Sequence, residues 1–139
     1  MTLRPDDRGL IATRCLLLAS GLLAAGIAAM SLIAPDVFYT AYGIEIGTDI
    51  NLRNELKASA GVLLFAGLLT LRGAFRTEFL TISLRVAATV FLSYGVFRLL
   101  SMMADGMPDF ALILAAVIEL IVGAACLQRL WKIPEYGGQ

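Results

Sequence analysis

The chain contains no histidine, and only 16% of its 139 residues are charged. Histidine is the commonest metal ligand, a frequent haem ligand and the usual general base at neutral pH. We therefore expect no metal site and no cofactor. The 11 basic and 11 acidic residues cancel, so no global field would attract a nucleic acid, and we expect no nucleic-acid partner.

Cysteine is also scarce. Cys15 and Cys126 stand far apart, without the CxxC spacing of zinc or redox sites. Because free cysteines commonly pack as small hydrophobic side chains, we expect both to lie in the interior between helices.

What the sequence has in abundance is hydrophobic residues, which make up 59% of the chain. Soluble domains contain roughly 45–50%, so the excess must face lipid. A transmembrane helix needs about 20 mostly apolar residues. The sequence predicts an all-α fold, a single integral membrane four-helix bundle spanning residues 1–139, with helices at about 10–33, 51–71, 79–103 and 108–130.

Pairs of small residues recur every four positions in the first predicted helix, at Ser20-Gly21, Ala24-Ala25 and Ala28-Ala29. Such a stripe lets a second helix approach closely. The sequence leaves open whether this neighbour belongs to the same chain or to another subunit, as in a homo-oligomer.

Basic residues near the helix ends predict the orientation in the membrane. The connections 34–50 and 104–109 contain no lysine or arginine. The opposite side holds Arg4, Arg8, Arg14, Arg72, Arg76, Arg85, Arg129 and Lys132. The positive-inside rule then places both termini in the cytoplasm and the longer first connection outside.

Three basic residues break this pattern, because Arg53, Lys57 and Arg98 lie at the outer ends of their helices. The fourth predicted helix carries one acid, Glu119, near the membrane midplane. An unpaired carboxylate there would cost at least ~2.5 kcal/mol. Glu119 follows Ala111 and Ala115 at four-residue spacing, so it should face a neighbouring helix.

On the third predicted helix, the spacing of Tyr94, Arg98 and Ser101 places them on one face. The polar faces of the last three helices therefore predict one outer-leaflet pocket with Glu119 as its floor. Its predicted ligand-binding residues are Asn51, Asn54, Glu55, Lys57, Ser59, Tyr94, Arg98, Asp105 and Glu119.

Each of these groups also has a structural interpretation. Glu55 and Arg98 would form an ion pair that fixes the register of two helices. Glu119 would be protonated or hydrogen-bonded to Ser93 or Tyr94. Asp105 would cap the turn between the last two predicted helices, and Asp109 would cap the start of the last one.

The segments Asn54-Glu55-Leu56-Lys57-Ala58, Arg98-Leu99-Leu100-Ser101 and Asp105-Gly106-Met107-Pro108, followed by Glu119, carry a family resemblance. They resemble the bacterial membrane proteins catalogued as the Domain of Unknown Function 4345 family, over about residues 34–130. Lys57 departs from the arginine common there, keeping the charge but losing the fork geometry. The resemblance implies a four-helix protein of the bacterial inner membrane and brings no established activity. The chain is more distantly similar to DoxX-like proteins.

Three functions fit this sequence, which does not identify a substrate or ligand. The first is a non-enzymatic membrane protein, surrounded by membrane lipid, that binds a lipophilic small molecule or an accessory subunit. The second is a membrane enzyme of isomerase or hydrolase type, with catalytic candidates Glu119, Glu55 and Arg98: either carboxylate would be the acid or base, and Arg98 would stabilise negative charge. The third is a proton-coupled carrier that uses Glu119.

Overall fold

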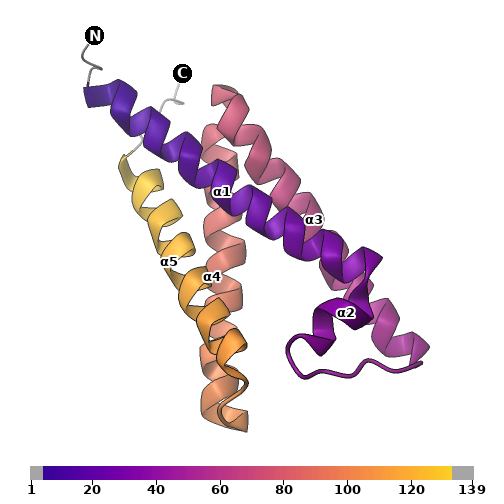
Figure 1. The fold of residues 1–139 in the computed structure, drawn as a ribbon. Coiled ribbons are helices and arrows are strands. Elements are labelled where there is room, and N and C mark those ends of the chain that lie inside the picture. Colours follow the sequence, from indigo (N-terminus) through magenta and orange to yellow (C-terminus); the bar gives the residue numbers. More distant parts are fainter. Residues whose placement is uncertain (1–4, 133–139) are drawn as a thin grey trace.

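A computed structural model describes residues 5–132 of the chain, and Figure 1 shows them as a set of helices. The long helices are α1 (Pro5–Ile33), α3 (Ile50–Phe75), α4 (Leu80–Asp105) and α5 (Phe110–Lys132). All four are long and apolar enough to cross a membrane, which confirms the all-α prediction of four membrane helices. The chain reverses direction between them, so α1 begins and α5 ends at the same end of the molecule (Figure 1).

Two of the long helices continue beyond their predicted bounds. Helix α1 begins at Pro5, and α3 continues to Phe75, although hydrophobicity falls before both points. The last turn of α3 contains Arg72, whose guanidinium lies 4.0 Å from the centre of the Phe79 ring. Such amphipathic contacts extend a helix into the polar layer of a membrane, where loss of hydrophobicity does not end the backbone hydrogen bonding.

The predicted connection 34–50 contains a short helix that the sequence interpretation missed, α2 (Pro35–Thr40). Pro35 not only follows α1 but also occupies the start of α2, where its fixed φ angle suits a helix. Residues 41–49 then form a loop with positive φ angles at Gly43 (72°) and Gly47 (61°). Ile46 in this loop is only 5% exposed, so the loop packs against the helices.

Arg53 holds this loop against the start of α3. Its Nη2 atom lies 2.6 Å from Oδ1 of Asp36, and its Nε and Nη2 donate to the carbonyl of Gly47 at 3.0 and 2.7 Å. Asp49 caps α3 by accepting the backbone N–H of Asn51 at 2.8 Å. One of the basic residues that broke the charge pattern thus has a structural partner in the loop.

The long helices pack as two antiparallel pairs, α1 with α3 and α4 with α5. In the first pair, a Cβ added at Gly67 would lie 2.7 Å from the backbone nitrogen of Ala25. The side chain of Leu71 similarly fills the space beside Gly21. The small-residue face predicted for the first helix therefore packs against α3 of the same chain.

The second pair has a reciprocal arrangement. Leu120 of α5 packs over Gly95 of α4, and Leu92 of α4 packs over Gly123 of α5, each at 2.7 Å from the position of a Cβ. Gly123 follows Glu119 at the same four-residue spacing as Ala111 and Ala115, so the small-residue stripe predicted on this helix does include a helix contact. The absence of side chains at the two glycines sets how closely α4 and α5 approach.

The two pairs meet at the end where the chain enters α1 and leaves α5, which we call the basic end. There Gly73 lies against Ser83 and Leu17, and Ser83 Oγ donates to the carbonyl of Leu69 at 2.6 Å. Towards the other end, the α2 end, α3 and α4 diverge (Figure 1). In the described part of the chain, α3 makes no contact with α5.

The two cysteines differ in their surroundings. Cys126 is 0% exposed and lies in the core with Leu17 and Leu84, as predicted. The prediction for Cys15 was wrong, because this residue is exposed. It lies two positions from buried Leu17 on α1, and a two-residue step on a helix points to nearly the opposite face.

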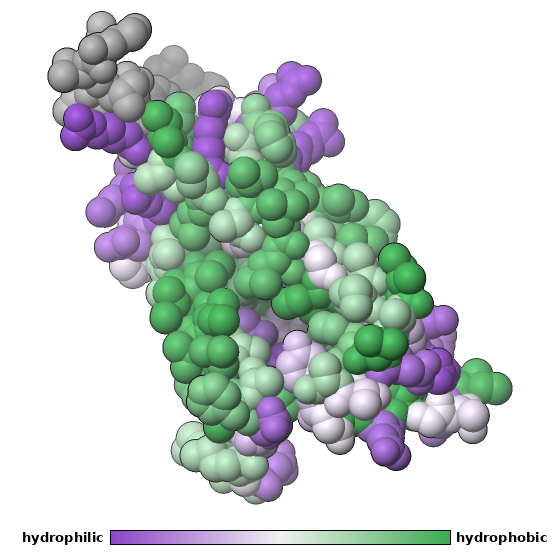
Figure 2. Space-filling view, viewed as in Figure 1, coloured by the Kyte–Doolittle hydropathy of each residue, from purple (hydrophilic) through white to green (hydrophobic). Residues whose placement is uncertain are grey.

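The outer surface suits a lipid environment. Figure 2 shows hydrophobic side chains covering most of the length of the molecule, with hydrophilic groups gathered at both ends. Val62, Phe65 and Ile121 are 71, 75 and 63% exposed. Apolar surface of this extent is rare on soluble monomers and is what a bilayer would cover. The protein is therefore described below as a multi-pass membrane protein.

Candidate functional site

An ion pair joins α4 to α5 in the half of the molecule near the α2 end. The Nε atom of Arg98 donates to both carboxylate oxygens of Glu119, at 2.9 and 3.2 Å. The Glu119 side chain is 13% exposed and that of Arg98 is 32% exposed. Helix packing at Gly95 and Gly123 brings the two helices close enough for this contact.

The predicted partner of Arg98 was wrong. The sequence predicted Glu55 as its partner, whereas the structure gives it Glu119. The side chain of Glu55 is exposed on α3. Towards the α2 end, where Glu55 lies, α3 and α4 diverge (Figure 1). Of the states that the sequence left open for Glu119, the structure shows the paired one, and its partner is Arg98 and neither Ser93 nor Tyr94.

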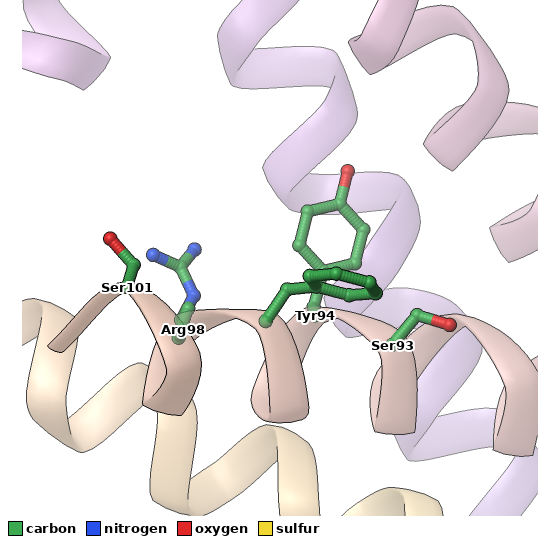
Figure 3. A pocket seen from close by; sticks show the side chains of 5 residues that line it. Ser93, Tyr94, Arg98 and Ser101 are labelled. Atoms are coloured by element: carbon green, nitrogen blue, oxygen red, sulfur yellow. The ribbon is translucent and has the colours of Figure 1, made fainter. Parts of the chain in front are cut away.

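Arg98 also lies at the edge of an open cavity of about 390 Å³. The cavity is lined from α4 by Ser93, Tyr94, Phe97, Arg98 and Ser101. Figure 3 shows Tyr94, Arg98 and Ser101 projecting from the same side of α4 into open space. The spacing of 94, 98 and 101 places them on one helix face, as the sequence predicted.

A second cavity, of about 310 Å³, continues from the first towards the α2 end. It shares Arg98 and Ser101 with the first and adds Asp105 with the apolar side chains of the α4–α5 connection. Ser101 Oγ donates to Oδ2 of Asp105 at 2.9 Å. We refer to the two cavities together, with Arg98 and Ser101 at their junction, as the α4 groove.

The structure brings together only part of the predicted site. Tyr94, Arg98 and Asp105 line the α4 groove, and Glu119 binds Arg98 behind it. The α3 residues contribute nothing to the lining of either cavity. These exposed side chains are Asn51, Asn54, Glu55, Lys57 and Ser59. The hydroxyl of Ser59 bonds to the Glu55 carbonyl of its own helix, at 3.0 Å.

Two lining residues received no ligand-binding role from the sequence. Phe97 looked like one of many apolar side chains of a membrane helix, and no polarity distinguished it. Ser101 was recognised only as a neighbour of Arg98 on the same face. Its three-residue spacing from Arg98 was the signal that could have placed it in the site.

The capping interpretation holds for one of the two aspartates. Asp109 accepts the backbone N–H of Ala111 at 2.9 Å and so caps the start of α5. Asp105 is the last residue of α4 and bonds to Ser101 instead. Its carboxylate therefore remains at the mouth of the α4 groove.

Within residues 5–132, no three side chains of the types that bind metals lie together. The polar groups of the groove are a guanidinium, two hydroxyl types and carboxylates. They can donate and accept hydrogen bonds and can balance charge, and they suit a ligand with a polar head and an apolar body.

Comparison with known proteins identifies a family without an assigned activity. No curated protein and no solved structure matches the chain, and the more distant DoxX-like similarity receives no support. A family model described as a domain of unknown function matches residues 12–130. The matched segment contains all of α3 and α4, most of α1 and α5, and every residue of the α4 groove. The chain therefore belongs to the DUF4345 family.

Proposed function

We propose that this protein binds a lipophilic small molecule in the α4 groove. The proposal rests on how the guanidinium of Arg98 is hydrogen-bonded. Only Nε bonds to Glu119, and the guanidinium borders both cavities. Arginine carries five N–H donors, so the four on its terminal nitrogens make no hydrogen bond to any residue between 5 and 132.

Such donors are costly to leave unused in an apolar layer. A polar group withdrawn from water without a hydrogen bond destabilises the protein, by about 1–3 kcal/mol on the basis of protein mutations. The carboxylate of Glu119 neutralises the charge of Arg98 but leaves its terminal nitrogens available. A ligand oxygen placed in the groove would satisfy them.

The groove also has a suitable size and surface. Binding sites for small molecules usually enclose about 300–1,000 Å³ and have mostly apolar walls with a few polar groups. The first cavity, at about 390 Å³, lies at the lower end of this range. Phe97 and the ring of Tyr94 supply the apolar wall, and Ser93, Ser101 and Arg98 supply the polar groups.

A single substitution can fill the first cavity without touching the ion pair. Ser93 is exposed and lines the cavity, so Ser93→Leu should occlude it. Ser59→Leu is the matched control, because Ser59 is also an exposed helix serine but lies on α3 outside the groove. The measurement is mass spectrometry of lipophilic molecules that copurify with each variant from membranes.

We expect one or more species enriched with the wild type and with Ser59→Leu, and reduced at least about fivefold with Ser93→Leu. Circular dichroism would verify that each variant keeps its helices. Equal amounts in all three proteins, or no enrichment over an unrelated membrane protein purified in parallel, would refute binding at this groove.

We further propose that the protein lies in the bacterial inner membrane with its basic end and both termini in the cytoplasm. The arginine and lysine residues at this end support that orientation, together with their absence from the α2 end outside Arg53, Lys57 and Arg98. Alkaline phosphatase fused after residue 107 should be active in the periplasm. The same enzyme fused after Arg76 should be inactive, and the reverse pattern would contradict this orientation.

The enzyme alternative is weaker in its original form. Of its two candidate carboxylates, Glu119 contacts Arg98, whereas Glu55 lies on α3, which does not contact α5. A catalytic role for Glu119 and Arg98 alone, a proton-coupled carrier, a homo-oligomer and an accessory subunit all stay predictions. We favour binding because it needs only the donors and the groove described above.

A further inference from the structure

We infer that the ligand of the α4 groove is an uncharged amphiphile, with an apolar chain and a head group that carries a hydrogen-bond-accepting oxygen. This inference rests on the proposed function and specifies the class of ligand. Alcohols, esters, ketones and quinones have such heads, whereas fatty acids and anionic lipids carry a full negative charge.

The charges around the groove favour a neutral head. Arg98 is the basic residue that lines it, and the Glu119 carboxylate lies 2.9 Å from Arg98 Nε. Asp105 adds a second carboxylate at the mouth. The formal charge of these three residues is therefore minus one. An anionic head would be attracted by the Arg98 guanidinium, but Glu119 already neutralises that charge. The anionic head would also be repelled by the carboxylates of Glu119 and Asp105.

A cationic head is disfavoured for a separate reason. The terminal nitrogens of Arg98 border both cavities, and they are donors that carry positive charge. A head that reached them would need to accept hydrogen bonds. An oxygen without formal charge meets this requirement and encounters no repulsion from Glu119.

Hydrogen bonding within the groove also favours a ligand whose uncharged head group accepts hydrogen bonds. The Ser101 hydroxyl donates its hydrogen to Asp105, so its remaining capacity at the groove is that of an acceptor. Arg98 then supplies N–H donors at the junction of the cavities. An acceptor oxygen fits beside Arg98, and a hydroxyl head could also donate its own hydrogen to Ser101 or Asp105.

The apolar walls on either side of this junction accommodate the rest of the molecule. Tyr94 and Phe97 line the first cavity, and Met102, Met107 and Leu112 line the second. Arg98 and Ser101 line both cavities, and Figure 3 shows them beside Tyr94 on α4. The head would therefore bind at the junction with its chain extended along α4.

The test compares two probes of the same chain length, radiolabelled oleyl alcohol and radiolabelled oleate. The full-length protein is placed in phosphatidylcholine nanodiscs at an alkaline pH that ionises oleate. We expect the wild type to bind the alcohol at least about tenfold more tightly, equivalent to about 1.4 kcal/mol. Glu119→Gln removes the carboxylate paired with Arg98, so oleate affinity should rise about tenfold and the preference should narrow or reverse.

A second variant tests the same inference in case Glu119→Gln does not fold. Asp105 is exposed at the end of α4, and Asp105→Asn should raise oleate affinity several-fold and narrow the preference for the alcohol. Glu55→Gln is the control, because it removes one acid from exposed α3 and should change neither affinity.

The outcomes separate the ligand class from the site. If both probes bind, Ser93→Leu weakens both, and the wild type shows no preference or prefers oleate, the uncharged class is wrong and the groove remains. The class is also overturned if neither acid substitution affects oleate. If neither probe binds above empty nanodiscs, or Ser93→Leu binds both as well as the wild type does, the proposed function fails and the inference fails with it.

Discussion

Arg98 donates its Nε–H to Glu119, across the contact between α4 and α5, at 2.9 Å. The pair consumes one arginine donor and leaves the terminal nitrogens beside the α4 groove. An arginine and an acid that would each be costly in the membrane thus stabilise one another. The same contact fixes two helices and presents a polar group to a cavity.

Removing Arg98 should therefore leave the carboxylate of Glu119 unpaired and destabilise the protein. We expect Arg98→Ala to lower the free energy of unfolding in detergent by up to about 3 kcal/mol. This is the lower part of the range for buried pairs, because the Arg98 side chain is 32% exposed. Arg98→Ala combined with Glu119→Gln should lose little more than Arg98→Ala alone.

Thermal or denaturant unfolding of this double-mutant cycle measures the coupling. Glu55→Gln provides the comparison, since Glu55 lies on α3 away from the pair. Its effect should add to that of Arg98→Ala within about 0.5 kcal/mol. A strong coupling of Arg98 to Glu55, with none to Glu119, would contradict the observed pairing.

Two glycines of α3 should respond in opposite ways to alanine. At Gly67 a Cβ would lie 2.7 Å from the backbone nitrogen of Ala25, whereas at Gly61 nothing lies within 4 Å. Gly67→Ala must push α1 and α3 apart, at a cost of about 1–3 kcal/mol. Gly61→Ala should be neutral or slightly stabilising because alanine favours the helix.

Unfolding in detergent, monitored by circular dichroism, would compare these two variants. Both positions lie in the same helix and undergo the same substitution, so a general effect of alanine on α3 would appear equally in both. Equal stability of the two variants would show that the α1–α3 contact tolerates more separation than the structure indicates.

The loop 41–49 should depend on Arg53. Its guanidinium bonds to Asp36 and to the Gly47 carbonyl, so Arg53→Ala removes the side chain that joins α2, the loop and α3. We expect hydrogen exchange in residues 41–49 to accelerate about tenfold or more, while global stability changes by less than ~1 kcal/mol, as is usual for exposed ion pairs.

Lys57→Ala is the matched control for this experiment. Lys57 is an exposed basic residue one helical turn further along α3, and its removal should leave exchange in the loop unchanged. Acceleration by both substitutions would indicate a general electrostatic effect, and no acceleration by Arg53→Ala would mean that Ile46 alone holds the loop.

The two cysteines should react at different rates with N-ethylmaleimide. Cys15 is exposed and Cys126 is 0% exposed, so the native protein in detergent should be modified at Cys15 at least about tenfold faster. Unfolding in dodecyl sulfate should remove the difference. Mass spectrometry of the peptides reads out each site, and rapid labelling of Cys126 in Cys15→Ser would show that the core opens readily.

The amino-acid sequence by itself determined the four membrane helices, because about 20 apolar residues must be hydrogen-bonded within a helix to cross a bilayer. It also indicated the small-residue packing faces, the need of Glu119 for a partner and the common face of Tyr94, Arg98 and Ser101. These features depend on composition and on the 3.6-residue helical period, both of which are local.

Only the tertiary structure decided which polar faces meet. Helical periodicity shows that Glu55 and Glu119 each lie on a polar or small-residue face, but it does not show which neighbour that face contacts. Close packing at Gly95 and Gly123 holds α4 against α5, while Gly67 holds α3 against α1. The partner of Arg98 is therefore Glu119, because contacts between backbones distant in sequence, and not the polarity of any one helix, determine the distances between side chains.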